Sequence, residues 1–209
     1  MKKTQVLTVT HLLTHSPNHL LTHSGLFVLA SKILLDANPL LKFTVIGDGD
    51  LMPSLMELTE RLQIRHAFVF TGWVNTDLDR YLMGIDIIVN PSIRGWSETF
   101  CIANIEAMAM KRPLVTYAAG GVGEYVAQPN DLNHHELFSI SKNAIIVNYP
   151  TPAAVSSAVE ALLTNETLRN SIATEGYNTV VLTVTHLLTH SPNHLLTHSR
   201  FRILQLKDK

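Results

Sequence analysis

The sequence lacks the features that several classes of protein need. One cysteine, Cys101, in 209 residues excludes an intramolecular disulfide framework and a zinc site built from cysteines, and it is typical of a reducing compartment. Lys and Arg number 16 against 17 Asp and Glu, so a net charge of −1 gives no reason to expect nucleic acid or an anionic membrane as a partner. The longest apolar stretch, residues 25–35, is interrupted by Lys32 and is shorter than the ~18 residues that cross a bilayer. We therefore expect a cytoplasmic protein without a transmembrane segment.

One segment of the chain occurs twice. Residues 6–24 (VLTVTHLLTHSPNHLLTHS) recur without a difference at 181–199. Structural repeats diverge outside their core positions, so complete identity indicates recently duplicated DNA or a gene-model error. Four histidines of the first copy follow i, i+4 spacing, as a metal-binding stripe would: His11, His15, His19 and His23. Because Pro17 breaks such a helix and the copy holds no Asp, Glu or Cys, we expect no metal site.

Between the two copies, β-branched runs alternate with helical patterns. This alternation predicts a parallel sheet covered by helices, with strands at residues 42–46, 67–71, 85–90, 113–117 and 144–148. The leucines from Leu51 to Leu62 have helical spacing, while Thr151 and Asn165 are typical caps of two later helices.

The expected fold class is α/β, with a single Rossmann-like domain over residues 26–178. Residues 1–25 are expected to be irregular. Residues 179–209 are expected to hold the second repeat copy and the remnant of a C-terminal helix.

Open parallel sheets bind ligands beyond the carboxyl ends of their strands, where loops lead into helix N-termini. Glycine-rich or polar loops follow four of the predicted strands: Gly47-Asp48-Gly49, Thr71-Gly72-Trp73-Val74, Pro91-Ser92 through Glu98-Thr99-Phe100-Cys101, and Gly120-Gly121-Val122-Gly123-Glu124. A single glycine-rich turn is weak support for a site, but four in register predict a ligand-binding edge. The alternative for Asp48 and Glu124 is that each only caps the helix that follows it.

These loops carry a resemblance to a known family. In order, the segments FTVIGDG, FTGWV, DIIVNPS, ETFCIANIEAMAMKRPLV and GGVGEYV resemble the C-terminal, donor-binding domain of the family 4 (group 1) retaining glycosyltransferases, which is one half of a GT-B fold. The most specific element is the pair Glu98 and Glu106, with seven residues between them. The resemblance implies transfer of a sugar from a UDP- or GDP-sugar to an unknown acceptor, without a metal or another cofactor.

The spacing of the two carboxylates also has a physical meaning. A helix that begins just after Glu98 would place Glu106 up to ~12 Å along its axis, comparable with the length of a sugar nucleotide. Backbone N–H groups between them, at Phe100, Cys101 and Ile102, would receive the diphosphate. The resemblance implies that Glu98, as the catalytic residue, contacts the donor sugar and that Glu106 contacts the ribose. Two solvated helix carboxylates are the alternative.

The resemblance implies further donor contacts in the other loops. Gly47, Gly49, Gly120 and Gly121 would lie near the donor. Trp73 and Val74 would lie at the base, with packing in the core as an equal alternative. We interpret Cys101, which stands where the family usually has glycine, as a small core residue rather than a nucleophile.

The family's phosphate clamp has no counterpart in this sequence. Family members carry a Gly-Arg and a Lys-Gly on the first strand and turn of this domain, and no such pair precedes Leu26. An acceptor-binding N-terminal domain is likewise not found. Because such a clamp stabilises charge in the transition state, its loss should slow transfer by orders of magnitude, and we expect this chain alone to be inactive. The alternative function is a non-catalytic nucleotide-sugar-binding module, or a half-enzyme that needs a separate N-terminal domain.

Overall fold

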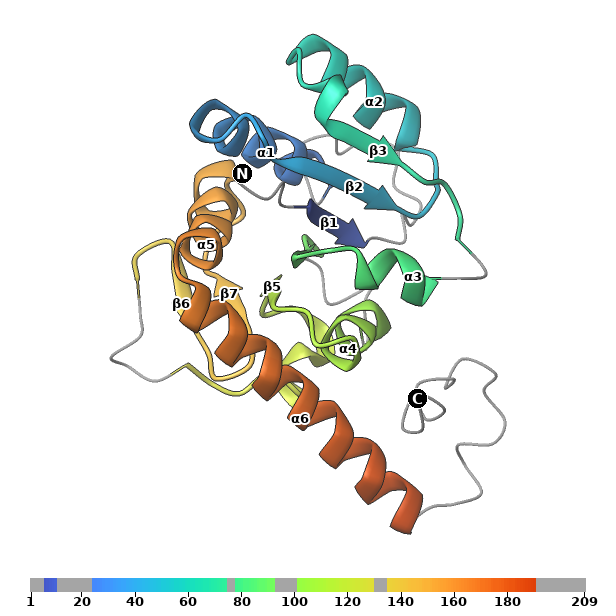
Figure 1. Cartoon of the computed structure of the whole chain (residues 1–209), viewed down its shortest axis with the longest axis vertical. Coiled ribbons are helices and arrows are strands. Elements are labelled where there is room, and N and C mark those ends of the chain that lie inside the picture. Colours follow the sequence, from blue (N-terminus) through green and yellow to red (C-terminus); the bar gives the residue numbers. More distant parts are fainter. Residues whose placement is uncertain (1–5, 11–23, 75–77, 93–100, 130–134, 191–209) are drawn as a thin grey trace.

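The structure, a computed structural model, describes residues 6–10, 24–74, 78–92, 101–129 and 135–190. A seven-stranded sheet in the order β3-β2-β1-β4-β5-β7-β6 lies at its centre (Figure 1). Every pair in it is parallel except β6–β7. The strands are β1 (Val6–Thr10), β2 (Lys42–Ile46), β3 (Phe68–Phe70), β4 (Ile87–Asn90), β5 (Leu114–Tyr117), β6 (Phe138–Ile140) and β7 (Ile145–Val147).

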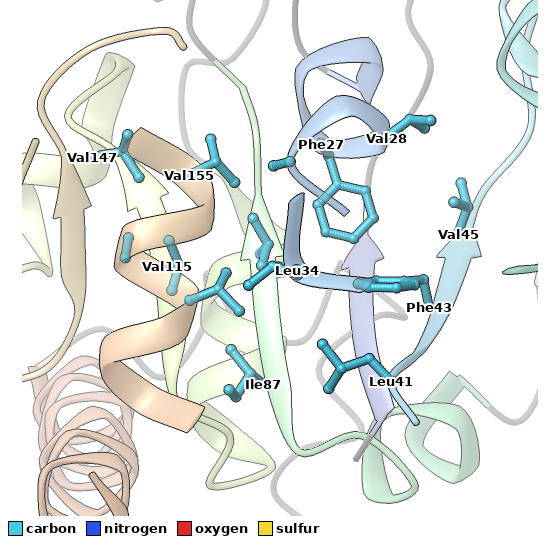
Figure 2. Packing of buried hydrophobic residues seen from close by; sticks show 14 of the residues in the cluster. Phe27, Val28, Leu34, Leu41, Phe43, Val45, Ile87, Val115, Val147 and Val155 are labelled. Atoms are coloured by element: carbon cyan, nitrogen blue, oxygen red, sulfur yellow. The ribbon is translucent and has the colours of Figure 1, made fainter. Parts of the chain in front are cut away.

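Helices cover both faces of the sheet, as the alternation of the sequence predicts. They are α1 (Ser24–Ala37), α2 (Met52–Arg61), α3 (Leu78–Met83), α4 (Ile102–Ala109), α5 (Pro152–Thr164) and α6 (Glu166–His190), with 3-10 turns η1 (Arg65–Ala67) and η2 (Gly120–Glu124). One core cluster joins α1, α2 and α5 to the sheet, and Figure 2 shows Phe27 of α1 beside Phe43 of β2 in it, with 5.8 Å between the ring centroids. A second cluster joins α3, α4 and α6 to the other face.

Side chains of a strand point alternately to the two faces, and β4 and β5 supply both clusters in this way. Ile87 and Val115 belong to the first cluster, whereas Ile88 and Leu114 belong to the second. A strand with both faces covered reads as a continuous apolar run, which explains why these two strands are visible in the sequence.

The structure confirms the predicted fold class and all five predicted strands. Their observed ends lie within two residues of the predicted ones. The predicted helix from Leu51 to Leu62 is α2, and Thr151 caps α5 by accepting a hydrogen bond from the N–H of Ala154 at 3.2 Å. Asn165 likewise accepts from the N–H of Leu168 at 2.9 Å at the start of α6.

Two strands were not predicted. The first, β1, lies in residues 1–25, for which we expected irregular structure, and that prediction is wrong for residues 6–10. Its backbone pairs in parallel with β2 on one side and with β4 on the other, so it takes a central position in the sheet. The second, β6, is an antiparallel edge strand of only three residues, which is too short to leave a periodic pattern.

The capping roles considered for two acidic residues are also wrong. The N-cap of α2 is Leu51, and the carboxylate of Asp48 instead accepts from the N–H of Gly49 at 2.8 Å. Glu124 is the exposed last residue of η2, and no described helix follows it directly.

Candidate functional site

The topology itself marks one place on the sheet. From β1 the chain adds β2 and then β3 on one side, whereas β4, β5 and β7 follow on the other side of β1. The direction of winding therefore reverses between β1 and β4. In open α/β sheets, ligands bind outside the carboxyl ends of the strands at such a switch point. The loops that follow β2, β3, β4 and β5 at this edge are the ones that the sequence predicts.

Two of these loops are joined to each other. Gly47, after β2, and Gly72, after β3, form an isolated antiparallel bridge in which the N–H of Gly47 donates to the carbonyl of Gly72 at 3.1 Å. Gly72 has a φ of 68°, in the left-handed region that other residues enter only with strain. Gly49 follows with a φ of 153°. The glycines thus shape one side of the edge.

The loop after β3 presents an aromatic residue to solvent. Trp73 is 53% exposed, which excludes core packing as the reason for this indole. Val74, in contrast, is partly buried and packs against the second core cluster, in agreement with the alternative given for it.

Helix α4 begins beside the switch point, but later than we predicted. The sequence suggested a helix that starts just after Glu98, whereas α4 starts at Ile102 with Cys101 as its N-cap. Glu106 is therefore four residues into the helix, about 6 Å along its axis, and its side chain is partly buried. Glu98 and Phe100 lie outside the described residues, so their roles stay predictions.

The side chain of Cys101 does not cap α4. It is 3% exposed, as expected for a small core residue. Its sulfur accepts a hydrogen bond from the side-chain amide of Asn90, the last residue of β4. Asn90 therefore ties the end of β4 to the beginning of α4.

Sequence reasoning missed a buried polar network that continues from this contact. Asn90 Nδ2 also donates to Asn104 Oδ1 at 2.8 Å, and Asn104 Nδ2 donates to Tyr125 Oη at 2.9 Å and to Thr116 Oγ1 at 3.3 Å. We call Asn90, Cys101, Asn104, Thr116 and Tyr125 the Asn104 network. The sequence carried one hint of it: Asn104 is a polar residue on a helix face that would be buried.

The loop after β5 begins with a second unforeseen feature. Tyr117, the last residue of β5, is 6% exposed, and its hydroxyl has no hydrogen-bond partner among the described residues. Burial raises the pKa of this phenol well above its usual 10.0, because the charged form loses its hydration. Gly120 follows with a φ of 56° and is exposed, and Gly121 is partly exposed at the start of η2.

Elsewhere in the described part of the chain, no cluster of side chains has an evident binding chemistry. No group of three or more His, Cys, Asp or Glu side chains that could hold a metal ion occurs among them. A pocket of about 410 Å³ lies between the β6–β7 turn and α6, lined among others by Lys142, Leu168 and Ser171. Since this turn precedes the amino end of β7, the pocket is at the opposite edge of the sheet. None of the helices described could cross a membrane.

Sequence comparison places the chain among known proteins. It is 32% identical over 132 residues to an uncharacterized glycosyltransferase of Methanocaldococcus jannaschii, a match that covers 63% of this chain and 30% of that protein. It is 26% identical over 132 residues to a 2-deoxystreptamine N-acetyl-D-glucosaminyltransferase of Streptomyces fradiae, covering 63% of this chain and 28% of that protein. The chain thus spans less than a third of the length of these curated relatives.

Solved structures share the fold. The C-terminal domain of the group 1 glycosyl transferase LpcC from Francisella tularensis superimposes with a TM-score of 0.66 at 19% identity, covering 86% of both chains. The Anabaena protein Alr3699/HepE, in complex with UDP and glucose, gives a TM-score of 0.68 at 17% identity, covering 91% of this chain and 48% of that one. The family model described as "Glycosyl transferases group 1" matches residues 19–165, and the chain therefore belongs to the group 1 glycosyltransferases.

Proposed function

We propose that this chain binds the nucleoside diphosphate of a UDP- or GDP-sugar at the switch point between β1 and β4, as the donor-binding part of a retaining glycosyltransferase. The observation that carries the proposal is the position of α4. Its N-terminus follows β4 at the carboxyl edge of the sheet, and no described side chain caps it.

A helix N-terminus suits a diphosphate for two reasons. The first N–H groups of a helix have no partner within it, and the aligned peptide dipoles add a partial positive charge there. In the proposed complex, the N–H groups of Cys101 and Ile102 donate to the phosphate oxygens, together with that of Phe100. UDP bound to the Anabaena protein, which has the same fold, supports this choice of ligand.

The neighbouring side chains fit the rest of a donor. In this proposal, the carboxylate of Glu106, one turn below Ile102, accepts hydrogen bonds from the ribose hydroxyls. The exposed indole of Trp73, with Val74 beside it, stacks on the base. The glycine loops at Gly47, Gly49, Gly120 and Gly121 leave room for the donor, and Glu98 contacts its sugar.

Calorimetry with UDP, GDP and their sugars tests donor binding. We expect Glu106→Gln to weaken binding of the preferred nucleotide by roughly tenfold, because hydrogen bonds to a charged group contribute roughly 1.5–3 kcal/mol. Glu160→Gln is the matched control, since Glu160 is an exposed glutamate on α5. Wild-type chain that binds no nucleotide at millimolar concentration would refute the proposal. Equal titrations in Mg²⁺ and in EDTA are expected for a donor held without a metal.

A second function, a binding module without activity of its own, follows from the sequence after β1. Residues 11–23 contain no Lys or Arg to stabilise the leaving diphosphate. The two functions differ in one assay. Release or transfer of labelled sugar by the full chain indicates an enzyme, and NMR of the product's anomeric proton then tests retention. Nucleotide binding without turnover indicates a module that acts with a further domain.

A further inference from the structure

The Asn104 network lies directly beneath the proposed diphosphate site. Its five side chains come from β4, β5, the N-cap and first turn of α4, and the residue after η2. All are buried, and Asn104, at 0% exposure, is the deepest. Buried polar groups are costly unless they are hydrogen-bonded, so a network at this depth needs to be closed.

Asn104 closes it through a single amide group. Its carbonyl oxygen accepts from Asn90, and its nitrogen donates to both Tyr125 and Thr116. These contacts fix the side chain in one orientation relative to β4, β5 and the end of η2. The backbone of α4 is thereby held in place one turn from its N-terminus, and the N–H of Asn104 bonds to the carbonyl of Cys101 at 3.1 Å.

The other end of the network reaches the loop itself. Asn90 Nδ2 donates to the sulfur of Cys101, and Asn90 Oδ1 accepts from the N–H of Ser92 at 3.1 Å. Ser92 and Cys101, which flank residues 93–100, are therefore both hydrogen-bonded to the side-chain amide of Asn90. A helix end that binds a ligand through N–H groups is sensitive to displacement, since an error of about 1 Å can cost up to about a hundredfold in function.

We propose that Asn104 is a positioning residue for the donor: it holds the first turn of α4 where its N–H groups meet the diphosphate. The inference rests on the function proposed above. An apolar side chain of the same shape would fill this space without needing hydrogen-bond partners, so space filling alone does not explain an asparagine here. A closed polar network, in contrast, orients the groups that it connects. Asn104 then acts most strongly on the phosphates, because the N–H groups that bind them lie in the turn that it holds, whereas the ribose contact comes from Glu106 further along α4. A larger effect on a nucleotide than on its nucleoside is therefore predicted.

A second buried asparagine provides a matched control. Asn143 is 3% exposed and donates to the carbonyl of Tyr125 at 2.8 Å and to Thr179 Oγ1 at 3.0 Å, while it accepts from the N–H of Ala127 at 3.0 Å. It lies before the amino end of β7, at the edge of the sheet opposite the donor loops. Asn104→Leu and Asn143→Leu thus remove similar sets of hydrogen bonds at the two edges.

The test compares UDP with uridine on the full chain, or GDP with guanosine if the wild-type chain prefers guanine. We expect Asn104→Leu to weaken UDP binding by about tenfold or more and uridine binding by much less, so that the ratio of UDP affinity to uridine affinity falls. Asn143→Leu is expected to lower the free energy of unfolding about as much as Asn104→Leu does. It is expected to leave the ratio of UDP affinity to uridine affinity unchanged. An unchanged ratio in Asn104→Leu, or an equal change in Asn143→Leu, overturns the inference.

If Asn104→Leu does not fold, Tyr125→Phe provides the test, because it removes one acceptor of the network and retains the ring. A smaller fall in the same affinity ratio supports the inference, and an unchanged ratio in the folded variant overturns it. Wild-type chain that binds neither nucleotide refutes the proposed function and this inference with it. Wild-type binding with an unaffected Asn104→Leu ratio refutes the inference alone.

Discussion

Gly176 of α6 faces Met108 of α4, and the contact between these helices allows a sharp prediction. A Cβ added at Gly176 would lie 3.1 Å from Met108 Cγ, 3.5 Å from Met108 Cβ and 3.6 Å from the carbonyl oxygen of Asn143. Met108 is fully buried, so it has little space into which to move. Alanine in place of glycine within a helix otherwise stabilises by about 1 kcal/mol. Overpacking a filled core costs about 1–3 kcal/mol, and we expect this cost to exceed the gain in helix propensity.

The net result for Gly176→Ala is a loss of about 1 kcal/mol in the free energy of unfolding, or a fall of about 2–4 °C in Tm for a chain of this size. Urea unfolding measures it. Asn178, exposed on the same helix, supplies the reference, because Asn178→Ala against Asn178→Gly gives the propensity difference without a clash. A gain in Gly176→Ala equal to that reference difference would refute the reasoning, since it would show that Met108 yields freely.

Three further predictions concern the side chains of Thr151 and Tyr117. Thr151→Ala removes the side-chain cap of α5 and should lower the free energy of unfolding by about 1 kcal/mol, which urea unfolding measures. No change would show that Thr151 does not cap α5 in solution. Tyr117→Phe removes a buried hydroxyl without a described partner and should raise that free energy by about 1 kcal/mol, and a loss would show that the hydroxyl is bonded. Because burial raises the pKa of Tyr117, the unfolded state releases the phenol proton first, and stability falls as the pH rises past 10.0. Tyr117→Phe should lose less stability than wild type between pH 8 and about pH 11.

The sequence was sufficient to predict the strands of the sheet that are buried on both faces. Such strands read as apolar β-branched runs whatever surrounds them, and β4 and β5 were found for that reason. The start of α4 was misplaced by several residues because Cys101 is not a typical N-cap and gives no signal. The Asn104 network could not be predicted, since Asn90 and Asn104 meet only after β4 and α4 are packed together.

The duplicated segment shows most clearly why local sequence was not enough. Residues 6–10 and 181–185 are the same five residues, VLTVT, yet the first copy is a strand and the second lies within α6. Valine and threonine favour strands modestly, by an amount that tertiary context overrides. At residues 6–10 the backbone finds partners on both sides, in β2 and in β4. At residues 181–185 the chain arrives from a helix that began at Glu166, so its costly nucleation is already complete and each residue only extends it.

This difference bears on the proposed site. Complete identity of the two copies led us to place both outside the domain, but β1 forms one of the two strands that define the switch point. Its register sets Val9 beside Val89, next to the end of β4 from which the loop to α4 departs. Residues 6–10 of the first copy are therefore part of the framework that carries the proposed donor loops, whereas residues 181–190 of the second copy extend a helix. What distinguishes them is the neighbours that the chain brings to each, and those neighbours are fixed by position in the fold.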